Sequence, residues 1–321
     1  MIAVVVPCYR VKKQILGVLA AIGPECEAVY VVDDACPEGS GDHVEAECRD
    51  ERVRVLRNDH NQGVGGATLA GYRAALADGA DVVVKLDGDG QMDPSLIPRL
   101  VRPILDGEAD YTKGNRFFEF EGLERMPRLR LIGNSMLSFA SKLSSGYWNL
   151  FDPTNGFTAI HAAVARQLPT AKLSPGYFFE SDLLFRLGIL RAVVCDVPMP
   201  AIYGGERSSL VIRHVAGPFA WKHLTNTAKR IFYNYYLRNF NIASIEILLG
   251  GAFLAFGTWF GASSWLRGIF ANTPQTSGTV MLAALPVIVG VQLVLAFLNY
   301  DLANVPRDPL HRRLLPALPR S

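Results

Sequence analysis

Two aspartates, Asp87 and Asp89, flank a glycine in the stretch KLDGDGQMDP, which runs from Lys85 to Pro94. They follow an apolar run, and the glycines beside them permit a tight turn. Carboxylate oxygens in such a turn can bind a divalent cation together with the oxygens of a diphosphate. Aspartate-glycine turns also occur without any metal, so this stretch alone leaves both alternatives open.

Two further motifs carry groups that suit a nucleotide. Asp33 and Asp34 end the apolar run AVYVVDD, where a carboxylate can accept hydrogen bonds from a ribose hydroxyl or a base N–H. The alternative is a loop acid or a helix N-cap. The glycine-rich stretch NQGVGGA (61–67) precedes a helical pattern, so its backbone and helix dipole can approach a nucleotide. It is neither a Walker A loop nor a complete G-x-G-x-x-G motif.

The elements that must position these residues alternate along the chain. β-branched runs predict strands at 2–7, 28–34, 53–58, 81–87, 109–117 and 192–197. Apolar spacing and proline placement predict helices at 11–22, 64–79, 94–107, 131–145 and 178–187. This alternation predicts an α/β fold with a mainly parallel sheet and helices on both faces. Ligands bind at the carboxyl ends of such strands, which is where the acids lie.

The last third of the sequence is different in character. Two apolar segments, 242–265 and 280–300, approach the roughly 20 residues that span a bilayer, with buried core helices as the alternative. A basic and aromatic stretch, 213–241, precedes them and suits an amphipathic helix on an anionic leaflet. Lysines and arginines precede the first segment and follow the second, and only Arg267 is expected in the loop between. This asymmetry predicts that both ends are cytoplasmic.

Composition excludes several classes of function. The net charge of +2 gives no sign of a nucleic-acid partner. The five cysteines lack Cys-x-x-Cys spacing and a histidine cluster, which argues against a zinc site and for reduced thiols. The first residues do not have the form of a signal peptide.

In this order and spacing, the motifs resemble those of the inverting family 2 glycosyltransferases, whose fold is GT-A (Rossmann-like). VVPCYR stands where that family has P-x-Y-N, with Arg10 in place of the usual Asn or Asp. NQGVGGA matches N-x-G-x-G-x-A, and DGDGQMDP matches D-x-D-x-Q-x-x-P. GNRF (114–117) matches a G-S-R element whose Arg116 would face the diphosphate or the acceptor phosphate. DPTNGF (152–157) matches the acceptor-side loop, and FFESD (178–182) stands where the family has its E-D base. The resemblance covers roughly residues 1–210.

The resemblance implies roles for individual residues. Nucleotide-sugar contacts are expected from Pro7, Tyr9, Asp33, Asp34, Asn61, Gly63, Gly65, Lys85, Asp87 and Gln91. Asp89, together with Asp87, is expected to bind Mg²⁺ or Mn²⁺, whereas Asp93 is expected only to cap the following helix. The acceptor phosphate is expected at Arg116, Asn155, Arg207 and Ser209.

The expected catalytic residues are Arg116 and one acid of the pair Glu180 and Asp182. An extra serine separates the two acids where the family has adjacent ones. Which acid is the base therefore stays open, and Asp182 is preferred.

The C-terminal part makes the chain similar to the polyprenyl-phosphate glycosyltransferases, such as the dolichyl-phosphate mannosyltransferases. The implied organisation is a catalytic domain (1–212), juxtamembrane amphipathic helices (213–241), a transmembrane hairpin (242–300) and a cytoplasmic tail (301–321). The implied reaction moves a sugar from a UDP- or GDP-sugar to undecaprenyl or dolichyl phosphate on the cytoplasmic leaflet of the bacterial inner membrane or its equivalent.

Two other functions stay open. One is transfer to a lipid-linked glycan in envelope polysaccharide assembly, and the other is an inactive membrane scaffold. No Q-x-x-R-W motif is present, which argues against a processive polysaccharide synthase. The sugar, the nucleotide and whether the protein is a homo-oligomer also stay open.

Overall fold

The structure, a computed structural model of the chain, describes residues 1–117, 128–200 and 212–314. It divides into two compact units. The first unit comprises Met1–Thr227 with Pro306–Ser321, and the second comprises Ala228–Val305.

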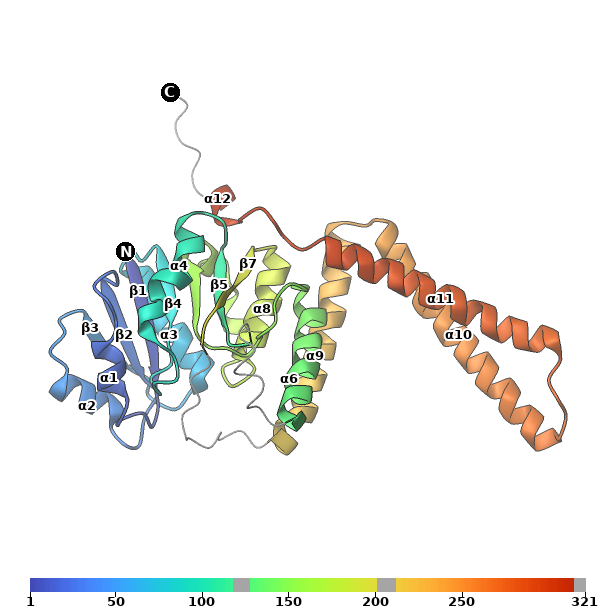
Figure 1. Cartoon of the computed structure of the whole chain (residues 1–321), viewed down its shortest axis with the longest axis horizontal. Helices are drawn as coiled ribbons and strands as arrows, with labels where there is room; N and C mark the ends of the chain where they lie inside the picture. Colours follow the sequence, from blue (N-terminus) through green and yellow to red (C-terminus); the bar gives the residue numbers. More distant parts are fainter. Residues whose placement is uncertain (118–127, 201–211, 315–321) are drawn as a thin grey trace, which may run out of the picture. The chain divides into compact units, whose positions relative to one another are not determined.

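The first unit is built on a seven-stranded sheet (Figure 1). Its strands are β1 (Ile2–Cys8), β2 (Ala28–Asp33), β3 (Val53–Arg57), β4 (Val82–Lys85), β5 (Tyr111–Asn115), β6 (Thr158–His161) and β7 (Val194–Pro198). Their order is β3-β2-β1-β4-β6-β5-β7, and only β6 runs antiparallel to its neighbours β4 and β5. The expected mainly parallel sheet is confirmed, but β6 was not among the expected strands.

Helices cover both faces of the sheet because its strands bury alternate residues on opposite sides. Val4 and Val6 belong to a core shared with α1 (Ile15–Ala20), α2 (Ser40–Glu47) and α4 (Ile97–Leu105). On the other face lie α3 (Gly63–Ala77) and α8 (Phe179–Leu190). Burying one valine or isoleucine side chain contributes about 1.5–3 kcal/mol, so both layers hold the strand ends in place.

Several boundaries differ from the expected ones. The helix expected at 11–22 forms only over 15–20, because Arg10 has a φ of 58° and residues 11–14 form a turn. Asp93 accepts a hydrogen bond from Ser95 N at 2.9 Å and caps the 3-10 turn η1 (Pro94–Leu96) ahead of α4. Its expected capping role is therefore confirmed. The helix α2 was not expected.

The first unit contains further helices among the described residues. They are α6 (Arg128–Ser145), α7 (Ala162–Ala165), the 3-10 turn η2 (Thr170–Lys172), most of α9 (Ile212–Phe232) and α12 (His311–Leu314). α6 and α9 are linked by a hydrogen bond between Ser144 Oγ and His223 Nδ1 at 2.9 Å. The short helix α12 lies in the part of the chain expected to be a tail, and the described residues from Pro306 onward belong to this unit.

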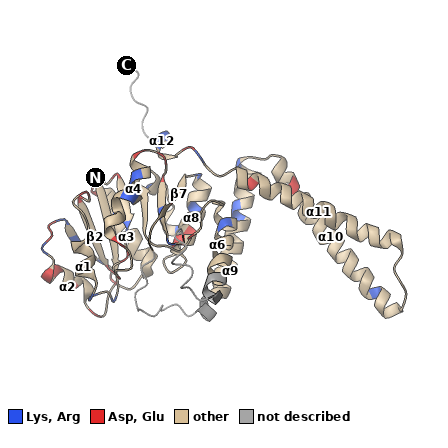
Figure 2. Ribbon diagram, viewed as in Figure 1, with Lys and Arg blue, Asp and Glu red and all other residues tan. Residues whose placement is uncertain are grey.

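The second unit contains α10 (Ile242–Ala271) and α11 (Ser277–Ala303), preceded by the end of α9 and a π-helical turn, η3 (Tyr233–Arg238). Both helices are long and apolar enough to cross a membrane, with mean hydropathies of 1.6 and 2.5. Only 22% and 11% of their most apolar windows are buried, which does not fit core helices of a water-soluble unit. Figure 2 shows how few charges they carry. Arg267 lies in α10 and not, as expected, in the loop.

A buried ion pair fastens the end of α9 to α11 within the second unit. Both terminal nitrogens of Arg230 donate to the carboxylate of Asp301, at 2.7 and 2.9 Å, and Tyr235 Oη also donates to it. Both charged side chains are less than 5% exposed. Separating Arg230 from Asp301 would leave a buried charge without its partner, which is costly. The pair therefore fixes the turn between α9 and α10 against the C-terminal end of α11.

Candidate active site

A buried lysine joins two of the expected site acids. Lys85 ends β4 and is 1% exposed; its Nζ donates to Asp87 Oδ1 at 2.8 Å and to Glu180 Oε1 at 3.1 Å. Burial by itself would lower the pKa of Lys85, but the two carboxylates outweigh it and raise that pKa. The ammonium therefore stays charged and aligns both acids.

Glu180 and Asp182 point to different surroundings because they are two residues apart on α8. Asp182 accepts from Ser174 N at 2.9 Å and from Asn226 Nδ2 at 3.3 Å, and its Oδ1 lies 3.6 Å from Arg186 Nε. Only Glu180 shares Lys85 with Asp87. The structure thus brings Glu180, and not Asp182, into the cluster at the end of β4.

The two acids at the end of β2 accept hydrogen bonds from the chain itself. Asp34 accepts from Asn58 Nδ2, Gln62 N and Gly63 N, at 2.7 to 2.9 Å. Asp33 accepts from Cys36 N in the loop before α2 and from Gly41 N in the first turn of α2. Both acids are less than 5% exposed. In this structure both acids hold loops at the carboxyl edge of the sheet through these hydrogen bonds.

The glycine-rich turn is likewise held in place. Gly63 has a φ of +79°, which favours glycine, and Gly65 N donates to Pro175 O at 2.8 Å. The turn therefore packs directly against the segment that leads into α8. Asn61 is exposed beside it, and its Oδ1 accepts from Gly63 N at 3.0 Å.

The remaining residues expected at the donor lie near the carboxyl ends of β1 and β4, two strands that pair in parallel. Tyr9 is 39% exposed, and Pro7, Asp89 and Gln91 are half-buried. Asp89 Oδ1 accepts from Gln91 N at 3.0 Å, which closes the turn. The described residues contain no group of three or more acids, histidines or cysteines arranged for a metal. Asp87 and Asp89 would thus supply at most part of a coordination shell.

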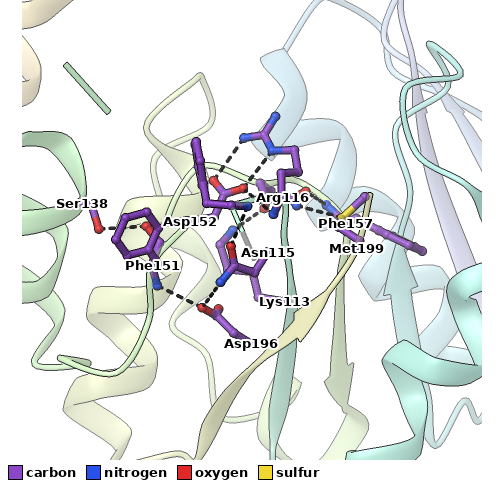
Figure 3. A network of polar contacts seen from close by, with 11 residues as sticks. Lys113, Asn115, Arg116, Ser138, Phe151, Asp152, Phe157, Asp196 and Met199 are labelled. Atoms are coloured by element: carbon purple, nitrogen blue, oxygen red, sulfur yellow. Dashed lines mark hydrogen bonds and ion pairs between the residues drawn. The ribbon is translucent and has the colours of Figure 1, made fainter. Parts of the chain in front are cut away.

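Arg116 is held by the buried carboxylate of Asp152 (Figure 3). Its Nε and Nη2 donate to the two oxygens of Asp152, at 2.8 and 3.1 Å. Asp152 is 1% exposed and Arg116 is 34% exposed. A two-point ion pair of this kind fixes the plane of the guanidinium.

The loop that carries Asp152 is held by hydrogen bonds to residues in and next to β5 and β7. Asn155 has both ends of its amide engaged, by Phe157 N and Met199 Sδ, and Lys113 Nζ donates to its backbone oxygen. Burial lowers the pKa of Lys113 to about 8. Asn155 is 2% exposed, so it shapes this loop from within.

Asp196 on β7 completes this network. Its Oδ2 accepts from Phe151 N at 2.9 Å and Asn115 Nδ2 at 3.0 Å, and burial raises its pKa to about 6. Neither Asp196 nor Lys113 was expected at the site. The sequence does contain a signal for Lys113. A lysine inside an otherwise buried strand requires a partner, so its position alone indicates a polar contact there. Arg207 and Ser209, expected near the acceptor, lie outside the described residues.

Comparison with known proteins gives a family match. The family model described as "Glycosyl transferase family 2" matches residues 3–168, just over half of the chain. That range includes Lys85, Asp87, Arg116 and Asp152, whereas Glu180 lies beyond it.

Two curated relatives align with the same part of the chain. The undecaprenyl-phosphate mannosyltransferase of Micrococcus luteus is 35% identical over 189 residues, which cover 57% of this chain and 75% of the relative. The UDP-N-acetylglucosamine–dolichyl-phosphate N-acetylglucosaminyltransferase of Methanococcus voltae is 30% identical over 152 residues, which cover 47% of this chain and 60% of the relative.

A solved structure supports the fold. Glucosyl-3-phosphoglycerate synthase from Mycobacterium tuberculosis, in a complex with Mn²⁺, UDP and glucosyl-3-phosphoglycerate, superposes with a TM-score of 0.52. The match covers 72% of this chain and 79% of that one at 20% identity. At this identity the likeness concerns the fold, and it confirms the expected GT-A architecture.

Proposed function

The chain belongs to glycosyl transferase family 2, and from this premise we propose that it moves a sugar from a UDP- or GDP-sugar to a polyprenyl phosphate. As a nucleotide-sugar-dependent glycosyltransferase it needs an acceptor, and the M. luteus and M. voltae relatives are named for polyprenyl or dolichyl phosphates. The single observation that supports a lipid phosphate as the acceptor is that the chain with this site also contains two apolar helices, α10 and α11, long enough to span a membrane.

The donor diphosphate is proposed to lie at the carboxyl ends of β1 and β4. Asp87 and Asp89 offer hard carboxylate oxygens on a partly exposed turn, which fits Mg²⁺ or Mn²⁺ if diphosphate and water supply the other ligands. When bound, the cation neutralises charge on the departing diphosphate. Lys85 holds the carboxylate of Asp87 at 2.8 Å and so fixes its orientation before the donor arrives.

The acceptor phosphate is proposed to bind at Arg116. Asp152 sets the plane of this guanidinium, and guanidinium pairs with phosphate through two parallel hydrogen bonds. A phosphate is already an anionic nucleophile and needs little activation. Its oxygen forms a bond to the anomeric carbon as the bond to the diphosphate breaks, so the configuration inverts.

Glu180 is proposed as the acid that acts at this centre. It is joined through Lys85 to Asp87, whereas Asp182 holds the segment before α8 and α9. This assignment departs from the preference for Asp182 based on sequence. With a phosphate acceptor, the role of Glu180 is to orient the cluster and to accept the residual proton of the acceptor.

The first unit is proposed to lie on the cytoplasmic side. Lys229 and Arg238 precede α10, and Arg307, Arg312 and Arg313 follow α11, so positive charge gathers at the same end of both helices. Positive flanks of transmembrane helices remain in the cytoplasm. Polyprenyl phosphate in the inner leaflet then meets a cytosolic nucleotide sugar.

A direct transfer assay tests this function. Purified full-length chain is incubated with undecaprenyl phosphate and radiolabelled UDP-glucose, UDP-N-acetylglucosamine or GDP-mannose, with and without Mg²⁺ or Mn²⁺. We expect a metal-dependent glycolipid, and Asp89→Asn should reduce its formation by at least about 100-fold. Asp93→Asn is the matched control, since Asp93 belongs to the same motif but only caps η1. Formation of product only on a lipid-linked glycan, or with none of these donors, would contradict the proposal.

A further inference from the structure

The face of α11 that points away from α10 carries a regular exposed pattern. Seven residues recur at alternating spacings of four and three, and each is exposed: Met281, Leu285, Ile288, Gln292, Leu295, Asn299 and Leu302. The apolar members are between 47% and 60% exposed. This is a heptad repeat, the pattern of a seam between two helices. We call these seven residues the outer seam.

The opposite face of α11 packs against α10. Gly290 lies against Gly250, and Ala283 and Val287 lie against Gly257 of α10. These contact positions are two residues from members of the outer seam, which places them on the other side of the helix. The hairpin therefore leaves the whole outer seam uncovered within the second unit.

Two members of the outer seam, Gln292 and Asn299, have amide side chains, which are unfavourable in lipid without a hydrogen-bond partner. Neither Gln292 nor Asn299 makes a side-chain hydrogen bond with any residue that the structure describes. A bilayer core takes about 20 residues of helix, and every 20-residue stretch of the 27-residue α11 contains Gln292. Hydrocarbon offers no partner to an amide at that depth.

We propose that the outer seam is a dimer interface at which α11 of one chain packs in parallel with α11 of a second copy. A carboxamide carries both a donor and an acceptor, so Gln292 can pair with Gln292 of a chain that has the same topology and therefore the same depth. Asn299, one heptad away on the same seam, repeats the pairing nearer the interface. Hydrogen bonds between amides of this kind drive association of transmembrane helices. The proposal does not depend on the catalytic activity of the first unit.

Cysteine cross-linking in native membranes tests the geometry. Met281→Cys and Ile288→Cys lie on the outer seam, while Leu282→Cys, at 53% exposed against 60% for Met281, lies on the neighbouring face. We expect oxidation with copper phenanthroline to give covalent dimers of the two seam variants and to leave Leu282→Cys and the unmodified chain largely monomeric. Equal cross-linking of the seam variants and Leu282→Cys would overturn the proposal, as would an adduct whose mass is not twice that of the chain.

A second measurement tests the amide itself. In the Ile288→Cys background, Gln292→Leu should lower the cross-linked fraction by at least about threefold, because the interchain hydrogen bond is lost. Val291→Leu changes an adjacent exposed residue without removing a polar group, and it should leave that fraction unchanged. An unchanged fraction in Gln292→Leu would overturn the assignment, since lipid packing alone would then explain the contact. Circular dichroism of each variant confirms that the helices form.

Discussion

Glu180 and Asp182 are separated by one residue, and the structure gives their carboxylates different surroundings. Glu180 reaches Lys85 at the end of β4, and Asp182 binds Ser174 N and Asn226. When two acids stand two positions apart on a helix, the sequence does not say which one faces the site. What distinguishes the two acids is the hydrogen bond that Glu180 accepts from Lys85, a residue 95 positions earlier in the chain.

Substitution of each acid separates the two roles. Glu180→Gln removes one of the two carboxylates that hold the Lys85 ammonium, so we expect kcat to fall by about tenfold or more while the fold is kept. Asp182→Asn keeps an oxygen for Ser174 N and loses the charge beside Arg186, so it should lower Tm more than kcat. Steady-state transfer rates and thermal unfolding of both variants check this.

The reverse pattern would reassign the acids. If Asp182→Asn lost transfer activity at unchanged Tm while Glu180→Gln retained it, Asp182 would be the residue at the reaction centre. Ser181→Ala, between the two acids on α8, serves as the matched control.

A second prediction at this scale concerns pH. His223 on α9 is 4% exposed, and burial lowers its pKa from 6.5 to about 4. The folded state therefore binds fewer protons than the unfolded state between these pH values, and stability falls as pH falls through that window. At pH 5 the loss from His223 is about 2 kcal/mol of the free energy of unfolding.

Urea unfolding at pH 7.5 and pH 5, followed by tryptophan fluorescence, measures this loss. His223→Gln should lose about 2 kcal/mol less than the wild type between the two pH values, because it does not titrate. The exposed His60, as His60→Gln, is the control and should behave like the wild type. An identical loss in His223→Gln and the wild type would contradict the prediction.

At the scale of elements, α10 and α11 approach closely because glycines line their contact. A Cβ added at Gly257 would lie 2.8 Å from Ala283 O and 2.7 Å from Val287 Cγ2, while one added at Gly251 meets nothing within 4 Å. In a membrane, packing of this kind replaces the hydrophobic effect as the source of helix association.

The two glycines give a matched pair of variants. Gly257→Leu should destabilise the hairpin by about 1–3 kcal/mol, because the helices must separate to admit the side chain. Gly251→Leu adds the same atoms on the open side and should change little. Loss of helicity on titration with SDS, followed by circular dichroism, compares them. Equal midpoints for the two variants would show that α10 and α11 do not pack through Gly257.

The sequence predicted the elements better than their arrangement. Continuous valine runs such as β1 and β4 bury both faces, so their existence and parallel direction follow from local pattern. The four-residue strand β6 has no such signal, because its place between β4 and β5 depends on pairing with residues 45 to 79 positions away. Strand order is a property of the whole sheet.

The same limit applies to the candidate site. Asp87 and Asp89 were predictable because the turn that holds them is local. The partners of Arg116 and Lys85 were not, since Asp152 and Glu180 reach them only through the fold. Asp34 shows the converse case. It lies where the motif places it, but its oxygens bind the chain's own amides, which the spacing of the motif does not reveal.

At the scale of the whole molecule, the chain leaves the first unit after Thr227 and returns to it at Pro306. The return is fixed at Asp110, a fully buried carboxylate. It accepts from Leu310 N, His311 N and His311 Nδ1, each at 2.7 Å, and also from Val193 N. The chain therefore enters and leaves the first unit at two points, and Asp110 accepts several of the hydrogen bonds that hold the returning segment.

Removal of the His311 side chain tests how the returning segment is held. His311→Ala deletes one hydrogen bond to Asp110 and the stacking on His161, whose ring centroid lies 4.3 Å away. A hydrogen bond to a charged group contributes about 1.5–3 kcal/mol, so amide exchange at Leu310 should accelerate by about tenfold or more. Arg313→Ala is the control, because its ion pair with Asp308 is exposed and contributes little. Hydrogen exchange measured by mass spectrometry on the full chain compares the two. If Leu310 exchanges equally fast in His311→Ala and the wild type, residues other than His311 hold this segment. Asp110→Asn then tests the remaining attachment, because it weakens all the amide contacts at once.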